Sequence, residues 1–202
     1  MANNDLERPH VFQRGISSRT LLLLHGTGAD EHDLLGLAGA LDPDASVLSP
    51  RGMHLESGMN RFFERYPDGS FNEASIDQGV AELAEFLEVA IVEYELDRAS
   101  IFGTGFSNGA NTASALMIKH PALLSGAALF GSTKPYREVE SVGLKGKQIW
   151  LANGDRDPYA PVGASEAWVQ ELQSFGAVVE WLRHPGGHQI SSAHVASITS
   201  SL

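Results

Sequence analysis

Short apolar runs alternate along this chain with longer segments whose apolar residues recur every three or four positions. The clearest run, residues 20–24, ends at His25-Gly26 and is typical of a strand buried on both faces. The clearest helical stripe comprises Ile76, Val80, Leu83, Ala84, Leu87, Ala90, Ile91 and Tyr94. Because such alternation joins parallel strands through crossover helices, we expect a mostly parallel sheet with helices on both faces.

The remaining elements continue this alternation. Further strands are predicted at residues 47–48, 99–102, 127–130, 149–152 and 178–182, and further helices at 110–119, 164–175 and 191–202. The long stretch 50–75 is predicted to be irregular. A chain of 202 residues with 43% hydrophobic residues suits one domain with its own core. We therefore predict a single α/β domain over residues 1–202, without a large lid.

Composition and charge exclude several kinds of site and partner. The chain has no cysteine, which rules out disulfides, zinc–thiolate sites and a cysteine nucleophile. Its net charge of −11 repels phosphate backbones and anionic lipids, so we expect no nucleic-acid partner and no membrane partner. Residues 1–10 show no apolar core of a secretory signal, and we expect a cytoplasmic protein. A small molecule is the expected partner.

The segment Gly105-Phe106-Ser107-Asn108-Gly109 is the strongest local motif. It matches G-x-S-x-G and lies between a predicted strand and a predicted helix. A sharp strand-to-helix turn of this kind needs glycines and exposes its serine. The alternative is a glycine-rich turn with a capping serine. We favour Ser107 as a nucleophile.

A nucleophilic serine needs a histidine base and an acid that orients it. Asp155 and Asp157 follow the strand at 149–152, and His184 and His188 follow the strand at 178–182. The carboxyl ends of parallel strands form the ligand-binding edge of such a sheet, so both segments are well placed. Spacing alone does not separate Asp155 from Asp157. We favour His188 over His184, because His188 follows two glycines and can reach over the sheet edge.

An oxyanion hole is expected next to the serine. One donor is the backbone N–H of the residue after the nucleophile, Asn108, and the other is most naturally Thr27 N–H in the loop after the first buried strand. His25 is expected to shape that loop. We expect no catalytic role for His10, His32, His120 and His194.

These four motifs, taken together, resemble the phospholipase/carboxylesterase family of α/β-hydrolases. The matching segments are Leu24–Gly28, Gly105–Gly109, Gly154–Pro158 and Gly187-His188, and the resemblance runs from about Thr20 to about Ile190. It implies the α/β-hydrolase fold and a catalytic triad of Ser107, Asp157 and His188. It also implies oxyanion donors at Thr27 and Asn108, and it allows a homodimer.

Within the family, the bacterial carboxylesterases are the closer likeness. The acyl-protein thioesterases typically carry Gln after the nucleophile and then Gly-Gly, where this chain has Asn108 and Gly109-Ala110. Dienelactone hydrolases share the fold but use a cysteine nucleophile. We therefore expect a serine carboxylesterase for small soluble esters that requires no metal or organic cofactor. An acyl thioesterase or lysophospholipase, a peptidase, and a non-catalytic binding protein on the same fold are the alternatives.

The stretch 50–75 is expected to shape the substrate pocket. We expect Met53, Phe62 and Phe63 to line its apolar side. Arg61 or Arg65 would meet a negative group on the substrate. The alternative is a surface loop in which arginines pair with glutamates and the phenylalanines pack inward.

Overall fold

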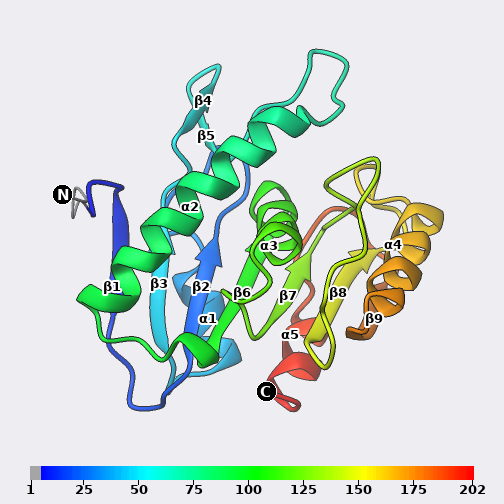
Figure 1. The fold of residues 1–202 in the computed structure, drawn as a ribbon. Coiled ribbons are helices and arrows are strands. Elements are labelled where there is room, and N and C mark those ends of the chain that lie inside the picture. Colours follow the sequence, from blue (N-terminus) through cyan, green and yellow to red (C-terminus); the bar gives the residue numbers. More distant parts are fainter. Residues whose placement is uncertain (1–5) are drawn as a thin grey trace.

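A seven-stranded sheet organises the computed structural model, which describes residues 6–202 (Figure 1). In spatial order its strands are β1 (His10–Gln13), β3 (Ser46–Pro50), β2 (Thr20–Leu24), β6 (Ile101–Phe106), β7 (Gly126–Phe130), β8 (Gln148–Gly154) and β9 (Val178–His184). All neighbours pair in parallel except β1, which runs antiparallel to β3 at the edge. The mostly parallel sheet is confirmed. Residues 1–5, part of the segment in which no secretory signal was expected, lie outside the described residues.

Helices cover both faces of this sheet (Figure 1). The larger core cluster packs α2 (Glu73–Glu93), α3 (Asn108–Lys119) and α4 (Val162–Ser174) against one face, and the smaller packs α1 (Leu35–Leu41) and α5 (Ser192–Thr199) against the other. Leu22 and Leu24 belong to the first cluster, whereas Leu21 and Leu23 belong to the second. Because successive strand residues point to opposite faces, the continuous leucine run of β2 supplies both cores.

The structure differs from the expected elements in ways with identifiable causes. Strand β6 extends through Gly103 and Gly105, which look like turn residues but sit where α3 packs close to the sheet. Helix α1 escaped prediction because it is short and contains two glycines, Gly36 and Gly39, which lower helix propensity. Strand β1 was also missed, since it is only half-buried and lies at the edge.

The stretch 50–75 is more ordered than expected. It contains a hairpin of β4 (His54–Glu56) and β5 (Met59–Arg61). The turn residues Ser57 and Gly58 have φ of 52° and 79°, as a two-residue hairpin turn requires. The prediction of a wholly irregular segment is therefore wrong. The hairpin rises above the carboxyl ends of the parallel strands (Figure 1).

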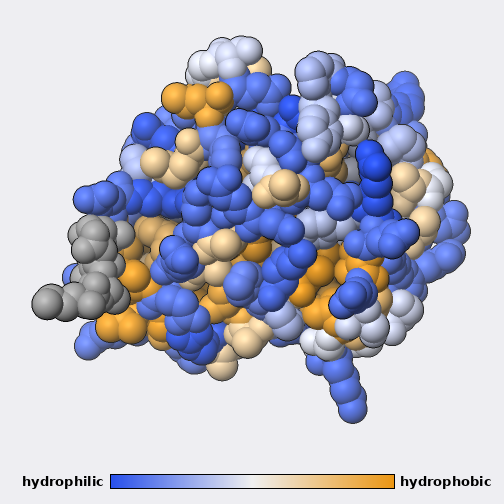
Figure 2. All heavy atoms as spheres, turned by 45° about the horizontal axis from the view of Figure 1, so that its top comes forward, coloured by the Kyte–Doolittle hydropathy of each residue, from blue (hydrophilic) through white to orange (hydrophobic). Residues whose placement is uncertain are grey.

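The surface around this end of the sheet is mostly hydrophilic, with apolar residues scattered in small groups (Figure 2). Among the helices in residues 6–202, none combines the length and the hydropathy needed to cross a bilayer.

Candidate active site

Ser107 occupies the sharp turn between β6 and α3. Its φ of 53° and ψ of −114° are strained for a residue with a side chain, and its N–H donates to Phe130 O at 2.9 Å. A Cβ at Gly105 would lie 2.6 Å from Ala110 N, and one at Gly109 would lie 1.9 Å from Leu24 O. The two motif glycines therefore allow the turn and the close approach of α3, and this arrangement presents Ser107 at the sheet edge.

Asp157 and His188 are hydrogen-bonded to each other. His188 Nδ1 lies 2.7 Å from Asp157 Oδ2, and the Asp157 residue is 4% exposed. The other carboxylate oxygen accepts the N–H groups of Tyr159 at 2.8 Å and Ala160 at 3.2 Å. These contacts satisfy the buried carboxylate and aim it at the imidazole.

The loop that carries His188 packs tightly on the loop that carries Asp157. A Cβ at Gly154 would lie 2.3 Å from Gly187 O, so β8 must end in glycine for the two loops to meet. The His188 ring also lies 4.9 Å, between centroids, from Phe106 and from Tyr159. The imidazole is thus held between two aromatic rings as well as by Asp157.

Ser107 and His188 line one cavity of about 470 Å³. Its wall consists of Gly26, Thr27, Ala29, Asp33, Arg61, Arg65, Phe106, Ser107, Tyr159 and His188. A second cavity of about 280 Å³ also reaches Ser107 and shares Arg65 and Tyr159 with the first. The serine therefore lies at the junction of two spaces that could receive the two sides of a substrate.

The competing acid and base make other contacts. Asp155 pairs with Arg183, whose Nε donates to it at 2.7 Å, and both side chains are exposed to solvent. His184 Nδ1 accepts Gly186 N–H at 3.0 Å, and its ring lies 5.0 Å from that of His194. Of the four candidates, the structure brings together only Asp157 and His188.

Both expected oxyanion donors lie at this site. Thr27 borders the larger cavity, and Asn108 opens α3, where backbone N–H groups have no acceptor within the helix. The Asn108 side chain has a role that sequence reasoning missed. It is fully buried, and its Oδ1 accepts Phe62 N–H at 2.8 Å. Asn108 thereby ties the segment after β5 to the start of α3.

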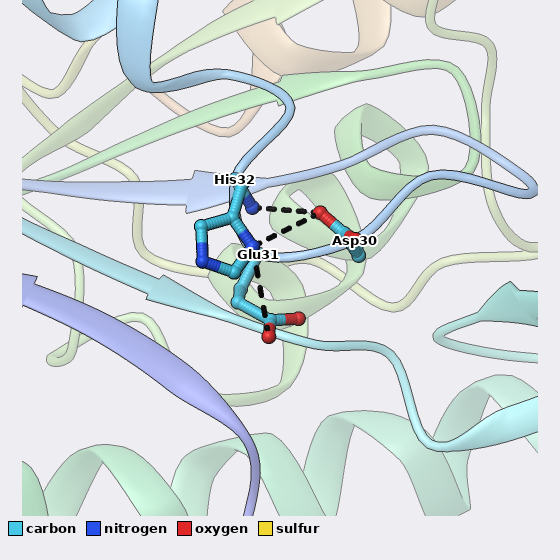
Figure 3. A group of neighbouring side chains, drawn as sticks. All are labelled: Asp30, Glu31 and His32. Atoms are coloured by element: carbon cyan, nitrogen blue, oxygen red, sulfur yellow. Dashed lines mark hydrogen bonds and ion pairs between the residues drawn. The ribbon is translucent and has the colours of Figure 1, made fainter.

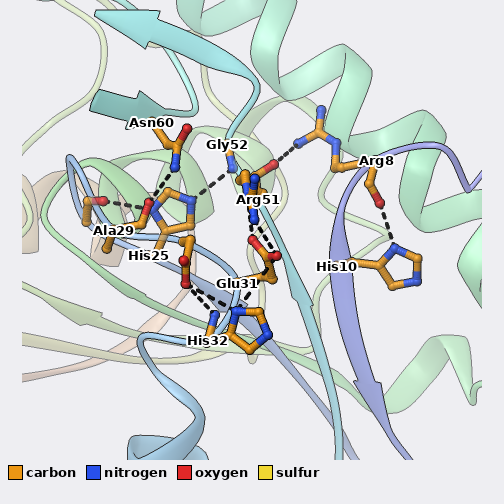
Figure 4. A network of polar contacts seen from close by, with 11 residues as sticks. Arg8, His10, His25, Ala29, Glu31, His32, Arg51, Gly52 and Asn60 are labelled. Carbon is orange, nitrogen blue, oxygen red and sulfur yellow. Dashed lines mark hydrogen bonds and ion pairs between the residues drawn. The ribbon is translucent and has the colours of Figure 1, made fainter. Parts of the chain in front are cut away.

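His25 shapes the loop that carries Thr27, as expected. Its Nε2 accepts Gly52 N–H at 2.9 Å (Figure 4). Its Nδ1 lies 2.7 Å from Gly26 O. Burial lowers the pKa of His25. The neutral ring with its proton on Nδ1 satisfies both contacts, and it joins the ends of β2 and β3.

Three of the expected pocket residues are not in either cavity wall. Phe62 and Phe63 are each 1% exposed and belong to the main core, whereas Met53 is 49% exposed. The prediction that these three residues line the pocket is therefore wrong. Asn108 holds the backbone at Phe62 while both phenylalanine rings pack in the core, and Met53 faces solvent. Arg61 and Arg65 do border the larger cavity.

Phe106 and Tyr159 also line the site, although sequence reasoning did not select them. Their positions in the sequence could have predicted this, because Phe106 directly precedes the proposed nucleophile and Tyr159 follows Asp157 by two residues.

Asp30, Glu31 and His32 form a compact group near this edge (Figure 3). Both Glu31 oxygens already accept Arg51, at 2.5 and 2.6 Å, and Asp30 Oδ1 accepts His32 N–H. Arg51 therefore neutralises the buried carboxylate of this group and ties it to the end of β3 (Figure 4).

Comparisons with known proteins identify the family of this chain. The sequence profile of the phospholipase/carboxylesterase family matches residues 11–202. MhqD of Bacillus subtilis (strain 168) is 37% identical over 182 residues, 90% of this chain and 91% of that protein. The crystal structure of the Bacillus cereus carboxylesterase is 39% identical with a TM-score of 0.94, and covers 99% of this chain and 98% of that one. The Mesorhizobium loti carboxylesterase is 31% identical with a TM-score of 0.86, covering 93% and 89%. This chain, with its α/β-hydrolase fold, therefore belongs to the phospholipase/carboxylesterase family of hydrolases.

Proposed function

We propose that this hydrolase is a serine carboxylesterase for small esters, with Ser107 as nucleophile, His188 as base and Asp157 as orienting acid. The observation that carries the proposal is the hydrogen bond between His188 and buried Asp157, in a cavity that also reaches the strained Ser107 turn. A nucleophile, a base and an orienting carboxylate in this arrangement support acyl transfer.

The mechanism has two halves. His188 Nε2 takes the proton of Ser107 Oγ as that oxygen attacks the ester carbonyl, and the N–H groups of Thr27 and Asn108 stabilise the oxyanion. The tetrahedral intermediate expels the alcohol, which receives the proton from His188. Water then attacks the acyl-enzyme with its proton passing to His188, and Ser107 recovers the proton as the acid leaves. The cycle requires no metal or organic cofactor.

The acid and the base can each be tested against a matched neighbour. Asp157→Asn should lower kcat on p-nitrophenyl acetate by about 10⁴-fold, because the imidazole loses its orienting charge. Asp155→Asn should stay within about twofold, since the Asp155 side chain pairs with Arg183 on the surface. Likewise His188→Gln should abolish turnover while His184→Gln retains it. Equal losses in the two members of a pair would contradict the assignment.

One further series of kinetic measurements tests both the nucleophile and the preferred acyl chain length. Wild type and Ser107→Ala are compared on p-nitrophenyl acetate, butyrate and octanoate. We expect turnover in the wild type alone, with the short esters preferred. A mutant as active as the wild type would refute Ser107 as nucleophile.

A thioesterase or a lysophospholipase would use the same machinery. Acyl-thioester and lysolipid substrates compared with the short esters distinguish these activities. We expect the short esters to have the highest kcat/KM, because residues 6–202 place no lid of apolar helices over the cavity to cover a long acyl chain.

A further inference from the structure

Arg61 borders the larger cavity, and one side of its guanidinium group lacks hydrogen-bond partners among the described residues. The residue is 3% exposed, and its Nη1 donates to Glu56 at 2.6 Å. Its Nε and Nη2 are buried without a hydrogen-bond partner among the described residues. Buried donors without an acceptor lower the stability of the folded protein. A fold that retains them on a cation is therefore expected to bind an acceptor at that position.

The unpaired atoms form the edge of a guanidinium that binds a carboxylate with two parallel hydrogen bonds. Arg51, in the same part of the chain, uses this edge on Glu31, with Nε and Nη2 donating at 2.5 and 2.6 Å. Two donors side by side match the two oxygens of a carboxylate. In Arg61 the same two nitrogens, Nε and Nη2, have no acceptor among the described residues.

Arg65 adds a second cation at the same place. It borders both cavities, and its guanidinium lies over the rings of Phe71 and Tyr159, at 5.3 and 5.8 Å from their centroids. Its Nε is also buried without a partner in the described part of the chain. Burial, followed by the charge of Arg61, lowers the pKa of Arg65, and a bound anion would relieve this repulsion.

The carboxylates near this wall leave part of the Arg61 guanidinium without an acceptor among the described residues. Glu56 engages one nitrogen of Arg61, and Asp33, the acidic side chain in the wall of the larger cavity, is itself exposed at the rim. Other arginines, such as Arg51, Arg98 and Arg183, are paired with carboxylates at their own positions. By contrast, Arg61 and Arg65 keep buried donors without a partner among residues 6–202, in the wall of the cavity that Ser107 also lines.

We propose that Arg61 and Arg65 bind a free carboxylate carried by the ester, so that the preferred substrates are esters with a second, ionised acid group. This deepens the proposed function and depends on it. Because the free edge of Arg61 is buried, its side chain or the β4–β5 hairpin must shift when the substrate binds.

The kinetic test uses pairs of esters that differ only in charge. Monoethyl succinate is compared with ethyl levulinate, and O-acetylglycolate with acetoxyacetone, so that a carboxylate replaces a methyl ketone on the acyl or the alcohol side. In at least one pair we expect kcat/KM to be at least about tenfold higher for the anion, as charge-assisted hydrogen bonds provide.

Variants of the two arginines test whether Arg61 and Arg65 cause the preference for anionic esters. Arg65→Gln and Arg61→Gln should each reduce the anion-to-neutral ratio about tenfold or more. Arg98→Gln is the matched control, because Arg98 pairs with Glu88 on the surface far from the cavity, and it should keep the wild-type ratio. Equal kcat/KM within both pairs, or a ratio unchanged by both arginine variants, would overturn the proposal.

A binding measurement separates this inference from the ester activity itself. Succinate should raise the melting temperature of the Ser107→Ala protein, and Arg65→Gln in that background should abolish the shift. Inorganic phosphate tests the rival anion, and a shift with phosphate but none with succinate would overturn the carboxylate. Succinate binding without ester turnover would refute the carboxylesterase function while retaining the anion site.

Discussion

Gly131 lies directly beside the imidazole of His188. Its φ is 62°, and a Cβ built on it would be 2.8 Å from His188 Cε1 and 3.0 Å from Nδ1. The carbonyl of the preceding residue, Phe130, accepts Ser107 N–H. One backbone turn after β7 thus contacts the segments of both the proposed nucleophile and the proposed base, and it has no room for a side chain.

Gly131→Ala should therefore impair catalysis more than folding. A methyl group would push the imidazole out of line, and a displacement near 1 Å lowers kcat/KM about 100-fold. Strain at positive φ should cost about 1–2 kcal/mol of stability. The measurements are ester kinetics and a thermal melt.

Gly146→Ala provides the control for backbone strain. Gly146 has a similar φ of 76°, but an added Cβ would meet no atom within 4 Å. We expect a similar loss of stability and wild-type turnover. If both variants lose activity alike, strain rather than contact with His188 is responsible.

Single residues also show where sequence reasoning stops. Asp155 and Asp157 lie in the same strand-end segment, and only burial and contacts distinguish them. Asp157 is 4% exposed and bonded to His188, whereas Asp155 faces solvent with Arg183. The resemblance to the family had selected Asp157, and the geometry supports the same choice.

Among the elements, α3 carries the tightest constraint. Its first turn packs directly on the end of β2, where Gly109 approaches the Leu24 carbonyl. This approach brings the first N–H groups of the helix to the edge at which the Thr27 loop begins. The strand–turn–helix unit is local in sequence, and its motif was therefore readable without the structure.

Gly109→Ala should separate α3 from β2. A Cβ 1.9 Å from Leu24 O can be relieved only by moving backbone, so we expect a loss of at least about 3 kcal/mol in the free energy of unfolding. Urea denaturation measures this loss.

Gly39→Ala in α1 is the control for Gly109→Ala, because it makes the same substitution in another helix. No atom lies within 4 Å of the added Cβ there, and alanine should stabilise the helix by about 0.5–1 kcal/mol. A Gly109→Ala protein as stable as the wild type would contradict the close packing of α3.

The molecule as a whole should lose stability in mild acid. His25 and His194 are 1% and 4% exposed, and burial lowers the pKa of both; nearby His184 further lowers that of His194. Below about pH 6.5 these histidines therefore bind protons more readily in the unfolded chain than in the folded chain. Their contribution to stability is complete above pH 6.5 and is lost as the pH falls below it.

Urea denaturation at pH 7.5, 6.5 and 5.5 measures this dependence. The loss between pH 7.5 and 5.5 should be smaller in His194→Phe, which keeps an aromatic ring against His184, than in the wild type. His32→Gln, which changes an exposed histidine, should keep the wild-type dependence. An unchanged dependence in His194→Phe would exclude His194 as a source.

The sequence by itself determined the alternation of strands and helices, the turn that presents Ser107, and the chain order of serine, acid and histidine. These features are readable because they repeat with local periods or occupy a few consecutive residues. Only the tertiary structure decided that Phe62 and Phe63 enter the core, and that two Arg61 nitrogens have no partner among the described residues at the cavity that Ser107 lines. Those outcomes depend on contacts such as Phe62 with Asn108, 46 residues apart, where packing and buried hydrogen bonds outweigh any local preference.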